Sequence, residues 1–175
     1  QTFDELPAGF TTYMPDGAME IDNGRIRFSI PGDVNTDIGL ISPPASFVGR
    51  TVAIEVSPSL TESASTTIGW HEQTGDLVGV HLEMDGFNLK LNQYNPTLNE
   101  YVEHVSEAYD PIAFAWWRMR EQDGDIVAEV SRDGESWALF GTASGRDVTM
   151  MTWDMGMGSF VTNVAPSVAT MDNAS

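Results

Sequence analysis

The stretch Ala113–Trp137, AFAWWRMREQDGDIVAEVSRDGESW, decides the fold of this chain. It divides into three short segments at two Asp-Gly pairs, Asp123-Gly124 and Asp133-Gly134. An Asp-Gly pair between alternating segments is the strongest short-range signal for a β-hairpin, because both turn residues adopt positive φ. The pattern therefore predicts three antiparallel strands in a meander.

The two turns also predict which residues face each other. With Asp123-Gly124 at the first turn, Arg118 lies opposite Glu129, and Trp117 lies opposite Val130. With Asp133-Gly134 at the second turn, Val130 lies opposite Trp137. One face is then apolar, and the other is polar with Trp116, Arg118, Arg120 and Glu129; the apolar face carries Trp117, Met119, Ala128, Val130 and Trp137. A meander with one apolar face is typical of an antiparallel sheet packed on a second sheet.

The rest of the chain also alternates at period two between Gly, Pro, Asn and Asp residues. Strands are predicted at 24–30, 50–57 and 66–71, and a last long strand or pair of strands at 146–160. Residues 101–108 fit either a strand or a short helix. A second hairpin around Asp85-Gly86 places Met84 opposite Phe87, Leu82 opposite Leu89 and Val80 opposite Leu91. About ten to twelve strands result, which favours a single all-β domain over residues 1–175.

The composition excludes several classes of partner. The chain has 175 residues with 26 acidic and 8 basic side chains, a formal net charge of −18. Such a surface repels nucleic acid and anionic membranes, so we expect no nucleic-acid partner. No apolar run approaches the ~20 residues that span a bilayer, so we expect no membrane insertion. The acidic excess fits solubility in salty surroundings, or alternatively cation binding.

Cysteine is absent, which excludes disulfides and a cysteine nucleophile. The chain begins at Gln1 instead of Met, so we expect a processed product or a piece of a longer protein.

The segment Trp116–Trp137 resembles the signature W-aliphatic-R-aliphatic-R, turn, strand, S-x-D-G-x-x-W of concanavalin A-like, laminin-G-like jelly-roll domains of bacteria and phages. FDELPAGFTTY, GRIRFSIP, RTVAIEVS and ATMDN fit the same template. The resemblance implies a two-sheet antiparallel jelly-roll sandwich in which the N- and C-terminal segments are adjacent. Members of this group bind glycans, accompany or form glycoside hydrolases, or build virions and surface proteins, so the fold alone does not select a function.

Retaining glycosidases need two carboxyl groups about 5 Å apart. On one strand this requires acids two or four residues apart, and the nearest matches are Glu20-Ile21-Asp22 and Glu83-Met84-Asp85. Neither pair has a third acid, and Asp85 is needed in a turn. The three histidines, His71, His81 and His104, lie in no nucleophile motif, although His71 and His81 could share an outer sheet face. These observations predict a chain without catalytic activity.

Calcium is the most credible ion. Asp33, Asn35 and Asp37 have the oxygen-ligand spacing of a calcium loop, although Ile38 and Pro44 stand where an EF-hand needs Gly and Glu. A second candidate combines Asp22 and Asn23 with Asp172 and Asn173, if the termini meet. Ordinary Asx turns are the alternative at both places.

Sugar binding needs exposed aromatic rings beside planar polar groups. The candidates are Trp116, Arg118, Arg120, Trp70, Tyr94, Tyr101 and Tyr109. The leading prediction is a non-catalytic recognition module that binds a glycan or surface receptor on a virion or in an extracellular assembly. One alternative is a structural virion component that contacts other subunits, and the other is a glycoside hydrolase.

Overall fold

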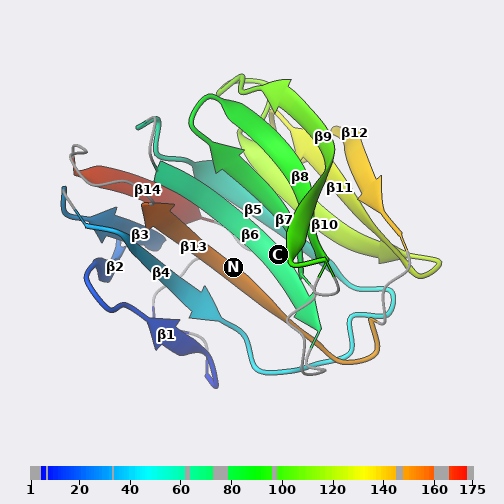
Figure 1. Ribbon diagram of the computed structural model, residues 1–175, viewed down its shortest axis with the longest axis horizontal. Helices are drawn as coiled ribbons and strands as arrows, with labels where there is room; N and C mark the ends of the chain where they lie inside the picture. Colours follow the sequence, from blue (N-terminus) through cyan, green and yellow to red (C-terminus); the bar gives the residue numbers. More distant parts are fainter. Residues whose placement is uncertain are drawn as a thin grey trace.

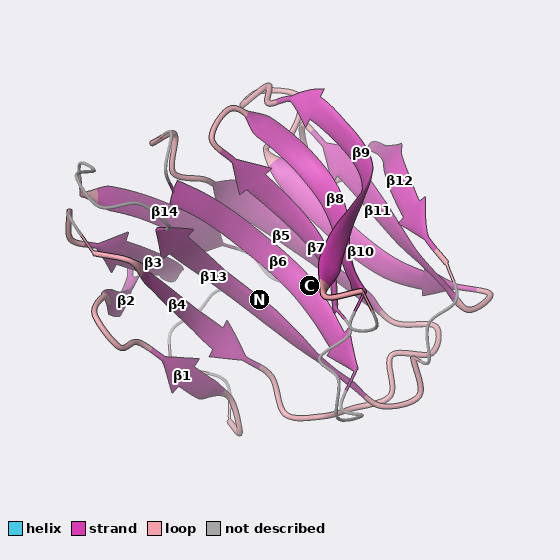
Figure 2. Cartoon of the chain, viewed as in Figure 1, coloured by secondary structure: helices cyan, strands magenta, loops and turns pink. Residues whose placement is uncertain are grey.

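The computed structural model describes residues 5–6, 8–32, 34–61, 64–72, 79–95, 98–144, 148–159 and 166–172. The described strands form two seven-stranded antiparallel sheets, and no helix occurs in these ranges. In Figure 1 the first sheet lies in front of the second, and Figure 2 shows the strands joined by loops. The predicted all-β jelly-roll sandwich is therefore confirmed.

The first sheet has the order β1-β4-β13-β6-β7-β8-β9. Its strands are β1 (Thr11–Tyr13), β4 (Thr36–Ile41), β13 (Met151–Ser159), β6 (Ala64–Glu72), β7 (Gly79–Asp85), β8 (Asn88–Asn95) and β9 (Glu100–Ala108). The second sheet has the order β12-β11-β10-β5-β14-β3-β2. Its strands are β12 (Trp137–Ala143), β11 (Asp125–Ser131), β10 (Trp116–Gln122), β5 (Thr51–Ser57), β14 (Ser167–Asp172), β3 (Arg25–Ile30) and β2 (Ala18–Asp22).

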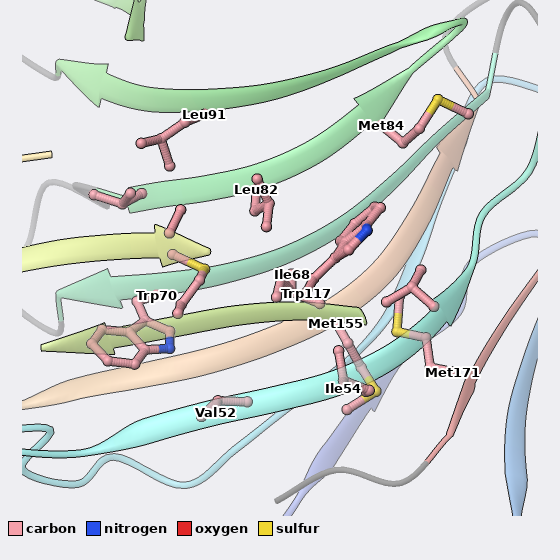
Figure 3. Close-up of a cluster of buried hydrophobic side chains, with 14 of the residues drawn as sticks. Val52, Ile54, Ile68, Trp70, Leu82, Met84, Leu91, Trp117, Met155 and Met171 are labelled. Carbon is pink, nitrogen blue, oxygen red and sulfur yellow. The ribbon is translucent and has the colours of Figure 1, made fainter. Parts of the chain in front are cut away.

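The core lies between the two sheets and is built from the inward residues that the alternation predicts. Figure 3 shows Trp70, Leu82 and Met155 of the first sheet facing Ile54 and Trp117 of the second. Trp70 and Trp117 are among the largest fully buried side chains, and Phe47 packs on Trp70 with ring centroids 4.8 Å apart. Each buried aliphatic or aromatic side chain of this size stabilises the fold by roughly 1.5–3 kcal/mol.

The first predicted turn is confirmed residue by residue, and the second is displaced. Trp117 pairs with Val130, and Arg118 pairs with Glu129. At the second turn, however, Ser131 and not Val130 lies opposite Trp137. The reason is a longer loop, in which the Ser131 hydroxyl accepts hydrogen bonds from the backbone N–H groups of Asp133 and Gly134. Trp137 therefore leaves the core, and the Arg118 guanidinium lies 4.0 Å from its ring centroid on the outer face.

The hairpin of β7 and β8 is also present, but its predicted register is wrong by two residues. Asp85 pairs with Asn88, and Met84 pairs with Leu89 and not with Phe87. The turn is thus formed by Gly86, at φ 66°, and Phe87, whose side chain is 63% exposed. A shift of two residues keeps every side chain on its predicted face, so the alternation of apolar residues cannot distinguish the two registers.

Three further predictions have clear outcomes. Residues 101–108 form a strand, β9, and not a helix. The region 146–160 contains one described strand, β13, and 146–147 and 160 lie outside the described residues. The C-terminal strand β14 pairs with β3 and β5, so segments from the two ends of the chain are adjacent as expected. The described strands number fourteen, two more than the upper prediction.

The charge of −18 predicts that salt stabilises this sandwich, because mobile ions screen the repulsion among acidic side chains. Raising the ionic strength from about 0.01 M to about 1 M shortens the Debye length from about 30 Å to about 3 Å. We expect Tm to increase by about 2–4 °C for every 1 kcal/mol of repulsion removed. Calorimetry in NaCl measures the shift, with an uncharged osmolyte as the control. An unchanged or lower Tm in NaCl would show that repulsion does not limit stability.

Candidate functional site

The outer face of the first sheet carries a cleft of about 510 Å³. It extends across β4, β13, β6, β7, β8 and β9, whose outward side chains alternate with the buried ones. Its lining combines carboxylates, an imidazole, an amide, a phenol and glycines; the residues are Asp37, Ile38, Ser65, Thr67, His81, Glu83, Asn92, Tyr101, Asp154, Gly156, Met157 and Gly158. We call this feature the outer cleft.

Asp154 of β13 forms a close pair with His71 of β6 at one end of the outer cleft. His71 Nε2 lies 2.8 Å from Asp154 Oδ1, and the two side chains are 22% and 26% exposed. Burial raises the pKa of Asp154, but the hydrogen bond and charge of His71 outweigh this effect and hold the pKa below its usual value. Burial likewise lowers the pKa of His71, and Asp154 more than offsets it, so that the pKa of His71 is raised. The pair therefore favours an ionised carboxylate.

His81 of β7 lies beside this pair. Its ring centroid is 4.8 Å from that of His71 and 6.0 Å from that of Tyr101. Burial, followed by the proximity of His71, lowers the pKa of His81 to about 4, so the imidazole is neutral near pH 7. Its buried Nε2 atom has no hydrogen-bond partner among the described residues.

Two glycines, Gly69 and Gly79, leave the space that the side chains of His71, His81 and Asp154 occupy. A Cβ atom at Gly69 would lie 2.6 Å from Asp154 Oδ1 and 3.2 Å from His71 Nε2. A Cβ atom at Gly79 would lie 2.5 Å from His81 Nε2 and 2.8 Å from His71 Nδ1. Any larger residue at either position would displace an imidazole or the carboxylate.

Glu83 follows His81 on the same face of β7, and its pKa is shifted in the opposite direction to that of Asp154. Burial raises its pKa, and this effect outweighs the hydrogen bond donated by Asn92 Nδ2 to Glu83 Oε2 at 3.1 Å. Burial also raises the pKa of Asp37 on β4. The outer cleft therefore holds one carboxyl group that is stabilised as the anion, Asp154, and two that retain their protons to higher pH, Glu83 and Asp37.

Aromatic rings border the cleft at β8 and β9. Tyr101 is 61% exposed, and its ring centroid lies 5.3 Å from that of Tyr94. The Tyr94 hydroxyl donates a hydrogen bond to Asn99 at 2.8 Å. Both residues were predicted from the sequence as sugar-binding candidates, and the structure places them together beside the acidic side chains.

The other predicted ligand-binding residues lie elsewhere. Trp70 is 1% exposed and belongs to the core. Trp116 is half-buried on the outer face of the second sheet, where a Cβ atom at Gly134 would lie 3.0 Å from its ring. Arg118 and Arg120 both donate hydrogen bonds to Glu129 Oε2, at 2.7 and 2.9 Å, as the cross-strand pairing predicted for Arg118 and Glu129. Tyr109 packs against Trp117 inside the sandwich.

The predicted calcium ligands lie only partly within the described residues, so the calcium sites stay a prediction. Asp33 lies outside the described residues, and Asp37 lines the outer cleft. Of the second candidate set, Asp172 accepts a hydrogen bond from Arg25 at 2.8 Å, and Asn173 is outside the described residues. Across the described ranges, no three His, Cys, Asp or Glu side chains are grouped as metal ligands. Within the same ranges, no helix is long and apolar enough to cross a bilayer.

Sequence reasoning missed Asp154, which the structure makes central. Carboxyl pairs within a single strand do not include Asp154 with Glu83. These two residues come from β13 and β7, and β6 lies between them. A signal existed in Asp154, Gly156 and Gly158, which alternate with Met155 and Met157. Glycine within a strand marks a place where a ligand or another backbone approaches closely. At Gly156 it is the neighbouring strand, since a Cβ atom there would lie 2.4 Å from the Ile38 carbonyl oxygen.

Comparison with solved structures identifies the architecture. A β-1,3-1,4-glucanase (lichenase) from a mouse hindgut metagenome superposes with a TM-score of 0.69 at 11% identity, over 98% of this chain and 94% of that chain. A Bacillus licheniformis β-glucanase gives 0.71 at 11% identity, over 99% and 94%. The carbohydrate-binding module CBM66 from Bacillus subtilis gives 0.60 at 10% identity, over 95% and 93%. No family model matches the chain, and no curated protein matches it.

These similarities contradict the prediction of a non-catalytic recognition module. Several of the solved structures that resemble the chain are glucan-cleaving enzymes, including an endo-β-1,3(4)-glucanase of family GH16. The lack of a suitable carboxyl pair within one strand does not exclude an enzyme, because two strands can each supply one carboxyl group. The glucanases and CBM66 share the two-sheet architecture seen here, and the chain has the concanavalin A-like jelly-roll fold that its sequence resembles.

Proposed function

We propose that this protein is a glycoside hydrolase that cleaves a neutral β-glucan in the outer cleft. Glu83 is the general acid, and Asp154 is the carboxylate that acts as base or nucleophile. The observation that carries the proposal is that one cleft holds two carboxyl groups whose environments shift their pKa values in opposite directions. Such divergence assigns the acid and the base in carboxylate-dependent enzymes.

The reaction follows from the protonated state of Glu83 and the ionised state of Asp154. Glu83 donates its proton to the oxygen of the glycosidic bond as the bond to the anomeric carbon breaks. Asp154 either removes a proton from the water that attacks this carbon, or attacks the carbon itself to form a glycosyl ester. In the second case a water molecule, deprotonated by Glu83, then cleaves the ester and frees Asp154. The products are two shorter glycans, one of which carries a new reducing end, and one water molecule is consumed.

The sheet register favours the water route and therefore inversion at the anomeric carbon. Asp154 pairs with Gly69 on β6, whereas Glu83 pairs with Thr67 on the same strand. Two strand spacings and two residues along the sheet separate the Cα atoms by roughly 12 Å. Side chains that stand on one face of a sheet at this Cα separation favour the wider carboxyl spacing of inverting enzymes, about 6.5–9.5 Å, over the roughly 5 Å of retaining enzymes. Proton NMR of the first product should show the inverted anomer; the retained anomer would contradict this assignment and favour direct attack.

A pair within β7 is the alternative, because Glu83 and Asp85 are two residues apart on one face. Asp85 is less suitable because it lies at the end of the strand, where Lys90 Nζ binds its Oδ2 at 3.0 Å. It is also absent from the lining of the outer cleft.

Charge and aromatic contacts support a neutral glucan as substrate. Among the described residues, the cleft lining contains three carboxyl groups and no Lys or Arg, so a uronic acid polymer would be repelled. Tyr101 is placed to stack on a sugar ring, and the similar structures include enzymes described as acting on β-1,3- and β-1,3-1,4-glucans. Since such polymers occur outside the cells that degrade them, we also propose extracellular action.

The first test is hydrolysis of purified β-glucans. The wild-type protein is incubated with β-1,3-, β-1,4- and mixed-linkage β-1,3-1,4-glucan, and new reducing ends are measured in NaCl. We expect at least one polymer to yield shorter oligosaccharides. Failure to release reducing ends from every polymer, by a protein shown to be folded, would refute the proposed function.

A further inference from the structure

The contact between His71 and Asp154 assigns a second role within the proposed site. We propose that His71 is a positioning residue, which holds Asp154 in one orientation and as the anion by donating a hydrogen bond from Nε2 to Oδ1. This inference rests on the proposed hydrolase function. It adds a residue on a neighbouring strand to the two carboxyl groups already assigned.

The geometry of the contact supports this role. On β6 and β13, His71 pairs with Thr152 and Asp154 pairs with Gly69, so the imidazole reaches the carboxylate along a diagonal of the sheet. Gly69 makes this diagonal contact sterically feasible, since its Cβ atom would lie 2.6 Å from Asp154 Oδ1. The hydrogen bond from His71 Nε2 to Oδ1 fixes the orientation of the carboxylate.

His71 is also the main source of positive potential at Asp154. The groups that face Asp154 are His71 from β6, His81 from β7, Asp37 from β4 and Tyr101 from β9. His81 is neutral near pH 7 and adds a smaller positive charge only when it is protonated, below about pH 4; Asp37 and Tyr101 supply none. No Lys or Arg occurs among the described residues that line the cleft. Removing His71 would thus remove both the hydrogen bond and the larger positive contribution at the Asp154 carboxylate.

The pH dependence of the reaction distinguishes positioning from a structural role. Catalysis requires ionised Asp154 and protonated Glu83, so the acidic limb of kcat/KM reports Asp154 and the alkaline limb reports Glu83. In His71→Phe we expect the acidic limb to move to higher pH by about 1–3 units, the range that loss of one charged partner produces. The alkaline limb should not move, because the pKa of Glu83 is shifted by burial and by its neighbours Asn92, Asp85, Ser65 and Lys90, and not by His71.

Two further variants separate the effect of the His71 charge from that of its hydrogen bond and provide a control. His71→Gln keeps an N–H donor but not the charge, so its acidic limb should lie between those of the wild type and His71→Phe. His104→Phe is the matched control, because His104 lies on β9 and its Nε2 contacts Gln93 at 2.8 Å, away from the cleft lining. Its pH profile should equal that of the wild type, and melting curves of all variants report folding.

Titration of the Asp154 carboxyl carbon by ¹³C NMR, in the wild type and in His71→Phe, gives a reading that does not need activity. A higher pKa of Asp154 in the variant supports positioning, whereas identical acidic limbs and identical Asp154 titrations in folded protein would overturn it. If the wild type cleaves no glucan, the hydrolase proposal fails and the role of His71 in catalysis fails with it. An active wild type with an unmoved Asp154 titration would refute the role of His71 alone.

Discussion

Replacement of Glu83 with Gln is expected to lower kcat by about 10²–10⁴-fold, the contribution of a positioned general acid. Gln keeps the size of the side chain and can still contact Asn92, which donates to Glu83 Oε2 at 3.1 Å. It cannot supply the proton that the leaving oxygen needs. Because the carboxyl group is buried and its pKa is raised, the substitution should not destabilise the fold. Initial rates on the preferred β-glucan, together with Tm, measure both effects.

Two control variants make this result specific. Glu103→Gln removes an exposed acid on β9, whose Oε2 lies 3.6 Å from Lys90 Nζ, and should leave kcat unchanged. Asp85→Asn tests the alternative pair within β7. If Asp85→Asn abolished hydrolysis while Asp154→Asn did not, the second carboxyl group would belong to β7 and Asp154 would lose its assigned role.

Replacement of Trp117 with Ala is expected to reduce the free energy of unfolding by about 3–5 kcal/mol. Trp117 is fully buried, and its Nε1 donates a hydrogen bond to the carbonyl oxygen of Phe114 at 2.9 Å. The substitution leaves a cavity between the sheets and removes one of the hydrogen bonds that the Phe114 carbonyl oxygen accepts, so that only the bond from the Tyr109 hydroxyl, at 3.3 Å, is kept. Both effects add to the lost burial. Urea unfolding, with the midpoint and slope fitted separately, provides the measurement.

Trp116→Ala is the matched control, because the adjacent residue points to the outer face and is only half-buried. Its loss of stability should be clearly smaller than that of Trp117→Ala. Equal losses would mean that the two faces of β10 contribute alike to the core, and a change near zero for Trp117→Ala would mean that the inward and outward faces are reversed.

The register between β7 and β8 is a feature that the sequence pattern alone could not predict. Val80, Leu82, Met84, Leu89 and Leu91 are all buried, as the alternation predicts. A slip of two residues preserves that alternation, so the choice between registers depends on the turn, where Gly86 and Phe87 take the central positions. The slip matters for the site, because it pairs His81 with Asn92, which makes the hydrogen bond to Glu83.

The loop after β11 displaces Trp137 for a similar reason. The Ser131 hydroxyl accepts a hydrogen bond from the Gly134 N–H, and Asp133 Oδ1 accepts one from the Ser136 N–H. These bonds stabilise a longer loop than the Asp-Gly pair alone would form. The following strand enters one residue later, and Trp137 changes from the inner to the outer face.

The sequence by itself determined the fold class, the inward faces of the main strands and the cross-strand pair of Arg118 with Glu129, because these depend on residues that are close along the chain. Only the tertiary structure decided the site. Asp154 and His71 are separated by 83 positions along the chain. Asp154 and Glu83 line the same cleft because β13 and β7 both pair with β6. Which strands become neighbours is decided by the packing of the whole sandwich, and no local pattern encodes it.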